Sequence, residues 1–117
     1  MNIEEYRNYC ISKKGVTEGF PFDETTLVFK VMGKMFALAG IAEFNYINLK
    51  CEPTKAIELR EELEGITPAY HMSKIHWNSV STLGNISNQL IYQLIDDSYN
   101  LVVSSLTKKL KTDLQQL

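Results

Sequence analysis

The sequence contains little cysteine, with Cys10 and Cys51 as the only two in 117 residues. They do not form a Cys-x-x-Cys pair, and a disulfide scaffold of this size would normally contain more cysteines. Both occur within apolar patterns, and no neighbouring feature would obviously activate either thiol. We therefore expect two small buried thiols rather than a disulfide framework or a catalytic cysteine.

Long hydrophobic runs are also absent. No segment approaches the roughly 18 apolar residues of a membrane-spanning helix. The first residues, Met1 to Glu5, have neither the basic region nor the apolar region of a signal peptide. These absences predict a cytoplasmic protein without a membrane partner.

The sequence has no excess of positive charge. It carries 12 Lys and Arg residues against 14 Asp and Glu residues, which gives a formal net charge of -2. Domains that hold nucleic acid by overall charge are usually basic, so this balance argues against strong nonspecific DNA binding. The distribution is uneven, however, because no acidic residue occurs between Gly65 and Ile95.

Complete catalytic and metal-binding motifs are missing. The glycines form neither a Gly-x-Gly-x-x-Gly fingerprint nor a Walker loop. His71 and His76 are five positions apart, but no nearby residue offers a third metal ligand. Ser98 has no base placed by any pattern, and the adjacent Asp96 and Asp97 would point in different directions on a helix. We therefore expect a non-catalytic protein with no cofactor and no bound metal.

What is present fits one folded domain spanning residues 1–117, with 44% hydrophobic and 22% charged residues. Hydrophobic periodicity and turn residues predict helices, strands and extended segments in a definite order. The helices are expected at 2–14, 53–64 and 88–109, the strands at 26–31, 35–39 and 46–51, the extended segments at 66–72 and 76–82, and a loop at 16–25. The order α-β-β-β-α-β-β-α predicts an α+β fold of two layers, with helices on one face of a single antiparallel sheet.

Such a fold leaves the second face of the sheet partly open. Basic, histidine and tryptophan side chains from the strands and their turns could gather there. The candidate binding residues are Lys30, Lys34, Lys50, His71, Lys74, His76 and Trp77. Lysines on this face would contact phosphates, and the aromatic ring of Trp77 would stack on bases. Two alternatives remain: strand lysines are commonly solvated, and Trp77 could instead be buried in the sheet.

Short motifs spread over nearly the whole chain resemble the MmcQ/YjbR family of small bacterial proteins. They are Phe20-Pro21-Phe22, Leu27 to Val31 with Gly33-Lys34, Asn48 to Cys51 with Pro53, Pro68 to Met72 with Lys74, His76-Trp77, and Leu94-Ile95 through Ser98-Tyr99. The resemblance implies an α-β(3)-α-β(2)-α fold, similar in shape to CyaY-like and secretion-chaperone-like domains. It also implies DNA binding through a proposed double-wing motif, in which the candidate residues above would make the contacts.

Three functions follow from the sequence and the resemblance. The first is binding of DNA by the lysine, histidine and tryptophan side chains. The second is a pocket for a small molecule or a small anionic ligand that uses the same residues. The third, which rests on fold analogy, is a protein-interaction module.

Overall fold

The computed structural model describes the whole chain, Met1–Leu117, as six strands and four helices. The helices are α1 (Ile3–Ile11), α2 (Pro53–Glu62), α3 (Asn88–Ser104) and α4 (Lys108–Gln115). The strands are β1 (Val16–Gly19), β2 (Thr26–Val31), β3 (Lys34–Gly40), β4 (Tyr46–Lys50), β5 (Ile66–Pro68) and β6 (Trp77–Ser81). All strands belong to one antiparallel sheet in the order β1-β2-β3-β4-β6-β5.

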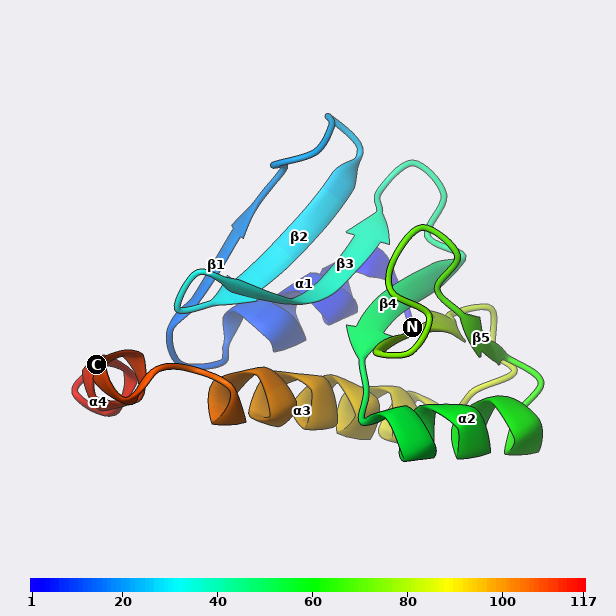
Figure 1. Ribbon diagram of the computed structural model, residues 1–117. Coiled ribbons are helices and arrows are strands. Elements are labelled where there is room, and N and C mark those ends of the chain that lie inside the picture. The colour runs from blue at the N-terminus through cyan, green and yellow to red at the C-terminus, as the bar shows by residue number, and fades with distance from the viewer.

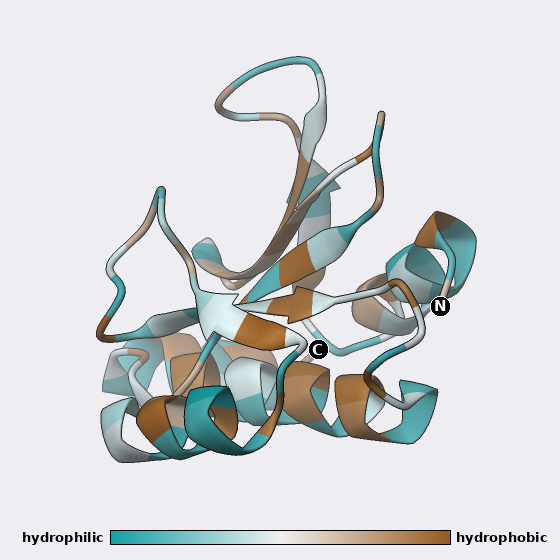
Figure 2. Ribbon diagram, turned by 90° about the vertical axis from the view of Figure 1, so that its right-hand side faces the viewer, coloured by the Kyte–Doolittle hydropathy of each residue, from teal (hydrophilic) through white to brown (hydrophobic).

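The helices lie on one side of this sheet (Figure 1). The side chains of β2 alternate between the two faces of the sheet. Leu27, Phe29 and Val31 belong to the main hydrophobic core on the helical face, whereas Val28 belongs to a small cluster on the other face. Figure 2 shows loops that extend from the sheet away from the helical layer. The predicted α+β class, with one sheet and two layers, is therefore confirmed. None of the helices is long and apolar enough to cross a membrane.

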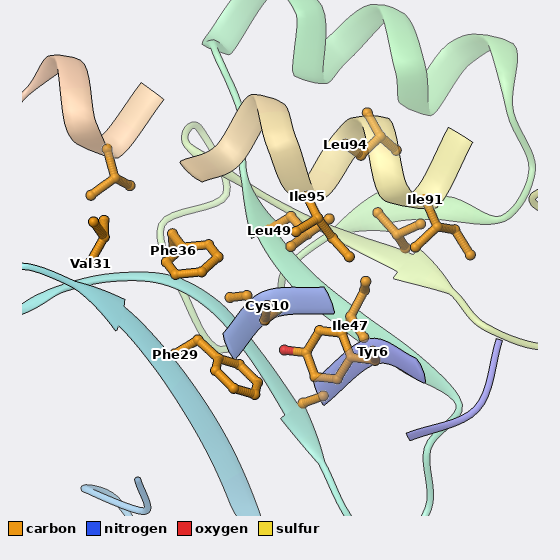
Figure 3. Close-up of a cluster of buried hydrophobic side chains, with 14 of the residues drawn as sticks. Tyr6, Cys10, Phe29, Val31, Phe36, Ile47, Leu49, Ile91, Leu94 and Ile95 are labelled. Atoms are coloured by element: carbon orange, nitrogen blue, oxygen red, sulfur yellow. The ribbon is translucent and has the colours of Figure 1, made fainter. Parts of the chain in front are cut away.

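The main core lies between the sheet, α1 and α3 (Figure 3). The ring of Tyr6 on α1 meets the ring of Phe29 edge-on, with ring centroids 5.4 Å apart. Cys10 is fully buried, and this burial raises the pKa of its thiol to about 12. Cys51 is half-buried, and burial raises its pKa as well. Cys10 is thus a buried thiol as expected, whereas Cys51 is only partly covered.

A β-bulge interrupts the pairing of β2 with β3. Phe29 pairs with Ala37 but Lys30 pairs with Met35, so Phe36 is an extra residue in β3. Phe36 and Ala37 are both fully buried although they are consecutive. The bulge therefore turns two neighbouring side chains toward the helices.

Ser98 of α3 bridges β3 and β4 beside this bulge. Its hydroxyl donates to the carbonyl oxygen of Phe36 at 2.6 Å and accepts from the backbone N–H of Lys50 at 2.9 Å. The Ser98 side chain is fully buried, so these two bonds satisfy polar groups that water cannot reach. Ser98 is therefore a structural residue that ties α3 to the sheet.

One strand occurs where the sequence predicts a loop. β1 lies within the segment 16–25, and Val16 pairs with Val31 while Thr17 pairs with Lys30. The strand has four residues, Val-Thr-Glu-Gly, which are too few to show an alternating pattern. Its conformation comes from pairing with β2, so tertiary context decides against local propensity.

The C-terminal helix predicted to reach Lys109 is divided in two. α3 ends at Ser104, and Thr107 begins α4 because its side chain accepts from the N–H of Leu110 at 3.2 Å. Figure 1 shows α4 turned away from the axis of α3. The turn brings Leu114 into the main core, which explains why the break is favourable.

Candidate ligand-binding cleft on the open sheet face

The loop between β5 and β6, residues 69–76, folds over part of the face that the helices leave open (Figure 1). Ala69 of this loop packs with Val28, Leu38 and Trp77 in a second, small hydrophobic cluster. Only 8% of Trp77 is exposed. The prediction that Trp77 stacks on bases is therefore wrong for this structure, because the loop covers the ring, and the alternative of a buried sheet tryptophan is correct.

Two adjoining hollows remain on the open face. The first, of about 380 Å³, lies above β4, β5 and β6, and the second, of about 430 Å³, lies toward β2 and β3. Both are lined by Tyr46, Asn48 and His71, so together they form one cleft with Tyr46 between its halves. We call this surface the open-face cleft. Its halves fall at the small end of the range of about 300–1,000 Å³ found for small-molecule sites.

The floor of the first hollow is low because its side chains are short. Asn48 on β4 pairs with Ser79 on β6, and Ser79 pairs with Thr67 on β5. Directly opposed side chains in an antiparallel sheet are close neighbours, so these three make a continuous polar floor. The hydroxyl of Ser79 donates to the side-chain oxygen of Asn48 at 2.5 Å. The amide nitrogen of Asn48 donates no hydrogen bond to another group of the protein.

Exposed aromatic rings form the walls. Tyr46 is 47% exposed, Tyr70 in the β5–β6 loop is 67% exposed, and Phe22 before β2 is 65% exposed. Tyr70 lines the first hollow and Phe22 lines the second. Phe20 and Phe22 are both exposed, because β1 extends to Gly19 and the residues that follow lie beyond the sheet.

The carboxylates that line the cleft have no lysine or arginine beside them in its lining. Glu64 lines the first hollow and Asp23 lines the second, whereas no lysine or arginine lines either. The carboxylate of Asp23 accepts from the N–H groups of Thr25 and Thr26 at 2.9 and 2.7 Å. These hydrogen bonds hold the pKa of Asp23 below its ordinary value, so the group is charged at neutral pH.

Three of the predicted lysines lie at one end of the sheet, away from this cleft. Lys30 and Lys34 flank the tight turn at Met32 and Gly33, which both have positive φ. β4 runs antiparallel to β3, so Lys50 at the end of β4 lies near the start of β3. No acidic group lies within 4.0 Å of these ammonium groups. We call Lys30, Lys34 and Lys50 the lysine end.

Apart from Trp77 on β6, the other predicted residues lie on the β5–β6 loop. His71 lines both hollows. Lys74 places its ammonium 5.2 Å from the ring centroid of Tyr70, and its carbonyl accepts from the Arg60 guanidinium at 3.3 Å. His76 is exposed, and its carbonyl accepts from a backbone N–H. The predicted residues therefore fall into two groups rather than one shared surface.

The residues that shape the cleft were not among the candidates predicted from the sequence, apart from His71. Tyr46 and Asn48 lie on the same strand face as Lys50. The sequence signal that could have identified them is the series of polar side chains at the outward-facing positions of β4 and β6. Ser79 and Ser81 on β6 continue it opposite Asn48 and Tyr46. A strand face covered by a helix would carry apolar side chains at these positions.

Comparison with known proteins places the chain in a family. The model of the YjbR family matches residues 11–101. YbdF of Escherichia coli O157:H7 is 42% identical over 91 residues, which cover 77% of this chain and 75% of that protein. YjbR of Escherichia coli K12 is 31% identical over 118 residues and the full length of both chains. YyaQ of Bacillus subtilis is 37% identical over 64% of this chain and 63% of its own. All three are named as uncharacterized proteins.

Solved structures agree with this assignment. The crystal structure of Deinococcus radiodurans protein DR2400 has a TM-score of 0.90 and 35% identity, covering 97% of this chain and 88% of that one. A Pseudomonas syringae protein has a TM-score of 0.72 and 31% identity, covering 86% of this chain and 98% of that one. The resemblance noted in the sequence is thus confirmed over most of its length, and the chain belongs to the YjbR family.

Proposed function

We propose that this chain is a non-catalytic binding protein whose ligand occupies the open-face cleft. The observation that carries the proposal is the pair of adjoining hollows, about 380 and 430 Å³, which share Tyr46, Asn48 and His71. A concave surface with a few convergent polar groups and aromatic walls is the usual form of a small-molecule site.

The groups in the cleft suit binding better than catalysis. Ser79 supplies a hydroxyl, but this hydroxyl donates to the amide oxygen of Asn48. An amide is too weak a base to take the proton and activate a nucleophile. The acidic side chains Glu64 and Asp23 line different hollows, so they do not form a carboxylate pair. This arrangement favours recognition through hydrogen bonds and ring contacts.

A thermal-shift screen with a panel of uncharged, anionic and cationic small molecules tests the proposal. The variant Ser79→Leu places a larger side chain on the floor of the cleft. Thr17→Leu is the matched control, because Thr17 pairs with Lys30 on the same sheet face but outside both hollows. Some compound should stabilise the parent and Thr17→Leu by about 2.7 kcal/mol at one hundred times its Kd, and should not stabilise Ser79→Leu. Equal stabilisation of all three proteins would refute the proposal.

DNA binding is a second candidate, and the lysine end favours it. Its three ammonium groups have no acidic partner within 4.0 Å, and Lys74 has none either. Unpaired lysines at one end of a sheet can contact consecutive phosphates. The net charge of -2 and the burial of Trp77 count against tight binding. We expect any such binding to be weak and sensitive to salt.

Fluorescence anisotropy with labelled duplex and single-stranded DNA tests this second candidate at about 50 mM and 200 mM salt. Binding through the lysine end should fall steeply between these concentrations and disappear when Lys30, Lys34, Lys50 and Lys74 are replaced by alanine. No binding of the parent at the lower salt concentration would eliminate DNA as the ligand. The same quadruple variant should still be stabilised by a ligand of the open-face cleft.

A further inference from the structure

We infer that the ligand of the open-face cleft is an uncharged molecule built around a flat heteroaromatic ring, of the size and type of a nucleoside. This inference rests on the proposed function, because it names the class of molecule for the same cleft. Three independent features of the cleft lead to it: its exposed rings, its unpaired amide donor and the sign of its charge.

The exposed rings favour a flat aromatic ligand. Tyr46 projects between the two hollows, and 47% of it is exposed although it lies on a strand within the sheet. Tyr70 faces the same first hollow and is 67% exposed. Exposed aromatic rings on a sheet offer stacking surfaces, worth about 1–3 kcal/mol for each base that they bind. An aliphatic ligand would gain burial here but not this stacking.

The floor favours a ring with polar edges. Ser79 fixes the oxygen of the Asn48 amide through a hydrogen bond, which leaves the amide N–H groups free to donate. Thr67 and Ser81 add hydroxyl groups that can donate or accept. A hydrocarbon ring would leave these polar groups without partners and would lose binding energy. The carbonyl oxygens and ring nitrogens of a nucleobase match such donors.

The charge excludes a phosphate on the ligand. Glu64 and Asp23 each place a carboxylate at the cleft, and neither has a lysine or arginine within 4.0 Å. An anionic group in the cleft would be repelled by these carboxylates, and no lysine or arginine in the lining offsets them. Lys74 holds its ammonium 5.2 Å from the ring centroid of Tyr70, but neither Lys74 nor the lysine end lines either hollow. The cleft should therefore prefer a nucleoside to its nucleotide.

Isothermal titration calorimetry with adenosine, guanosine, cytidine and uridine, and with their 5′-monophosphates, tests the inference on the full chain. At least one nucleoside should bind, about tenfold more tightly than its monophosphate. Tyr46→Leu should weaken nucleoside binding at least as much, because it removes a ring and keeps apolar bulk. Phe20→Leu is the matched control, since Phe20 is equally exposed, 47%, but lies outside both hollows.

A charge variant adds a second readout. Glu64→Gln should raise the affinity for the monophosphate relative to the nucleoside, because it removes one repelling carboxylate. The inference fails if the monophosphates bind more tightly than the nucleosides, or if Tyr46→Leu and Phe20→Leu have equal effects. It also fails if no nucleoside binds while another compound gives stabilisation that Ser79→Leu abolishes. In that last case the proposed function stands although the inference fails. If no compound gives stabilisation that Ser79→Leu abolishes, both the proposed function and the inference fail.

Discussion

Ser98 places one hydroxyl between β3 and β4, beside the bulge in β3. The carbonyl of Phe36 and the N–H of Lys50 both depend on this hydroxyl for a hydrogen bond. Removing a side chain that satisfies buried polar groups costs more than the bond itself, because the remaining groups lose their partners.

Ser98→Ala should therefore lower the free energy of unfolding by about 1–3 kcal/mol, measured by urea denaturation. Ser104→Ala is the control, because Ser104 is exposed on the same helix and its hydroxyl donates to the Leu101 carbonyl one turn earlier. That variant should change stability by less than about 0.5 kcal/mol. Equal losses in the two variants would show that the bridge contributes nothing beyond helix propensity.

Residue-level features were predictable where they follow from alternation along a strand. The placement of Lys30 and Lys50 on the open face is correct, because side chains alternate between the two faces of a sheet. The burial of Trp77 could not be predicted in the same way. Alternation predicts which face of the sheet Trp77 lies on. Whether the ring is exposed there depends on the β5–β6 loop, whose Ala69 packs against it. The shape of the cleft also depends on that loop, through Tyr70 and His71.

At the scale of elements, α2 begins with an ionised cap. The carboxylate of Glu52 accepts from the N–H groups of Thr54 and Lys55 at 3.1 and 3.0 Å. These hydrogen bonds hold the pKa of Glu52 below its ordinary value. A lowered pKa in the folded state means that the charged cap stabilises the protein above the pKa of the unfolded chain. The stabilisation is lost as the pH falls through the folded pKa.

Glu52→Gln should therefore lower Tm at pH 7, and the difference from the parent should shrink as the pH falls below about 4.3, the ordinary pKa of Glu. Thermal unfolding followed by circular dichroism over that pH range measures both. Glu58→Gln serves as the control, since Glu58 is exposed on the same helix and accepts no hydrogen bond from a cap position. A difference that stayed constant with pH would contradict an ionic cap.

Elements with local signals were predicted well. β2, β3 and the turn between them agree with expectation, because a β-rich run is followed by Gly33, which takes the positive φ that the turn needs. The capping box of Asn2 and Glu5 is also present. β1 and the break before α4 were missed because both depend on partners distant in sequence, β2 for the strand and the main core for Leu114.

On the scale of the whole molecule, the two sheet faces have different roles. One face carries the main core beneath α1 and α3, and the fold built on this core is shared with the Deinococcus radiodurans relative. The other face holds the open-face cleft in one part, and Lys30 and Lys50 of the lysine end lie elsewhere on it, whereas Lys34 pairs with the core-facing Val31. The sequence correctly predicted that this face would be partly open. It also predicted one binding surface shared by the lysines, His71 and Trp77, because position along a strand does not show where a loop will cover the sheet or leave a hollow.

We propose that ligand binds in the open-face cleft and not at the lysine end. Chemical-shift mapping of backbone amides in the ¹⁵N-labelled protein, titrated with the nucleoside that binds most tightly, tests it most directly. We predict that the largest shift changes fall on residues of the cleft floor and walls, namely Tyr46, Asn48, Thr67, Tyr70, Ser79 and Ser81. Changes centred instead on Lys30, Lys34 and Lys50 would contradict the account.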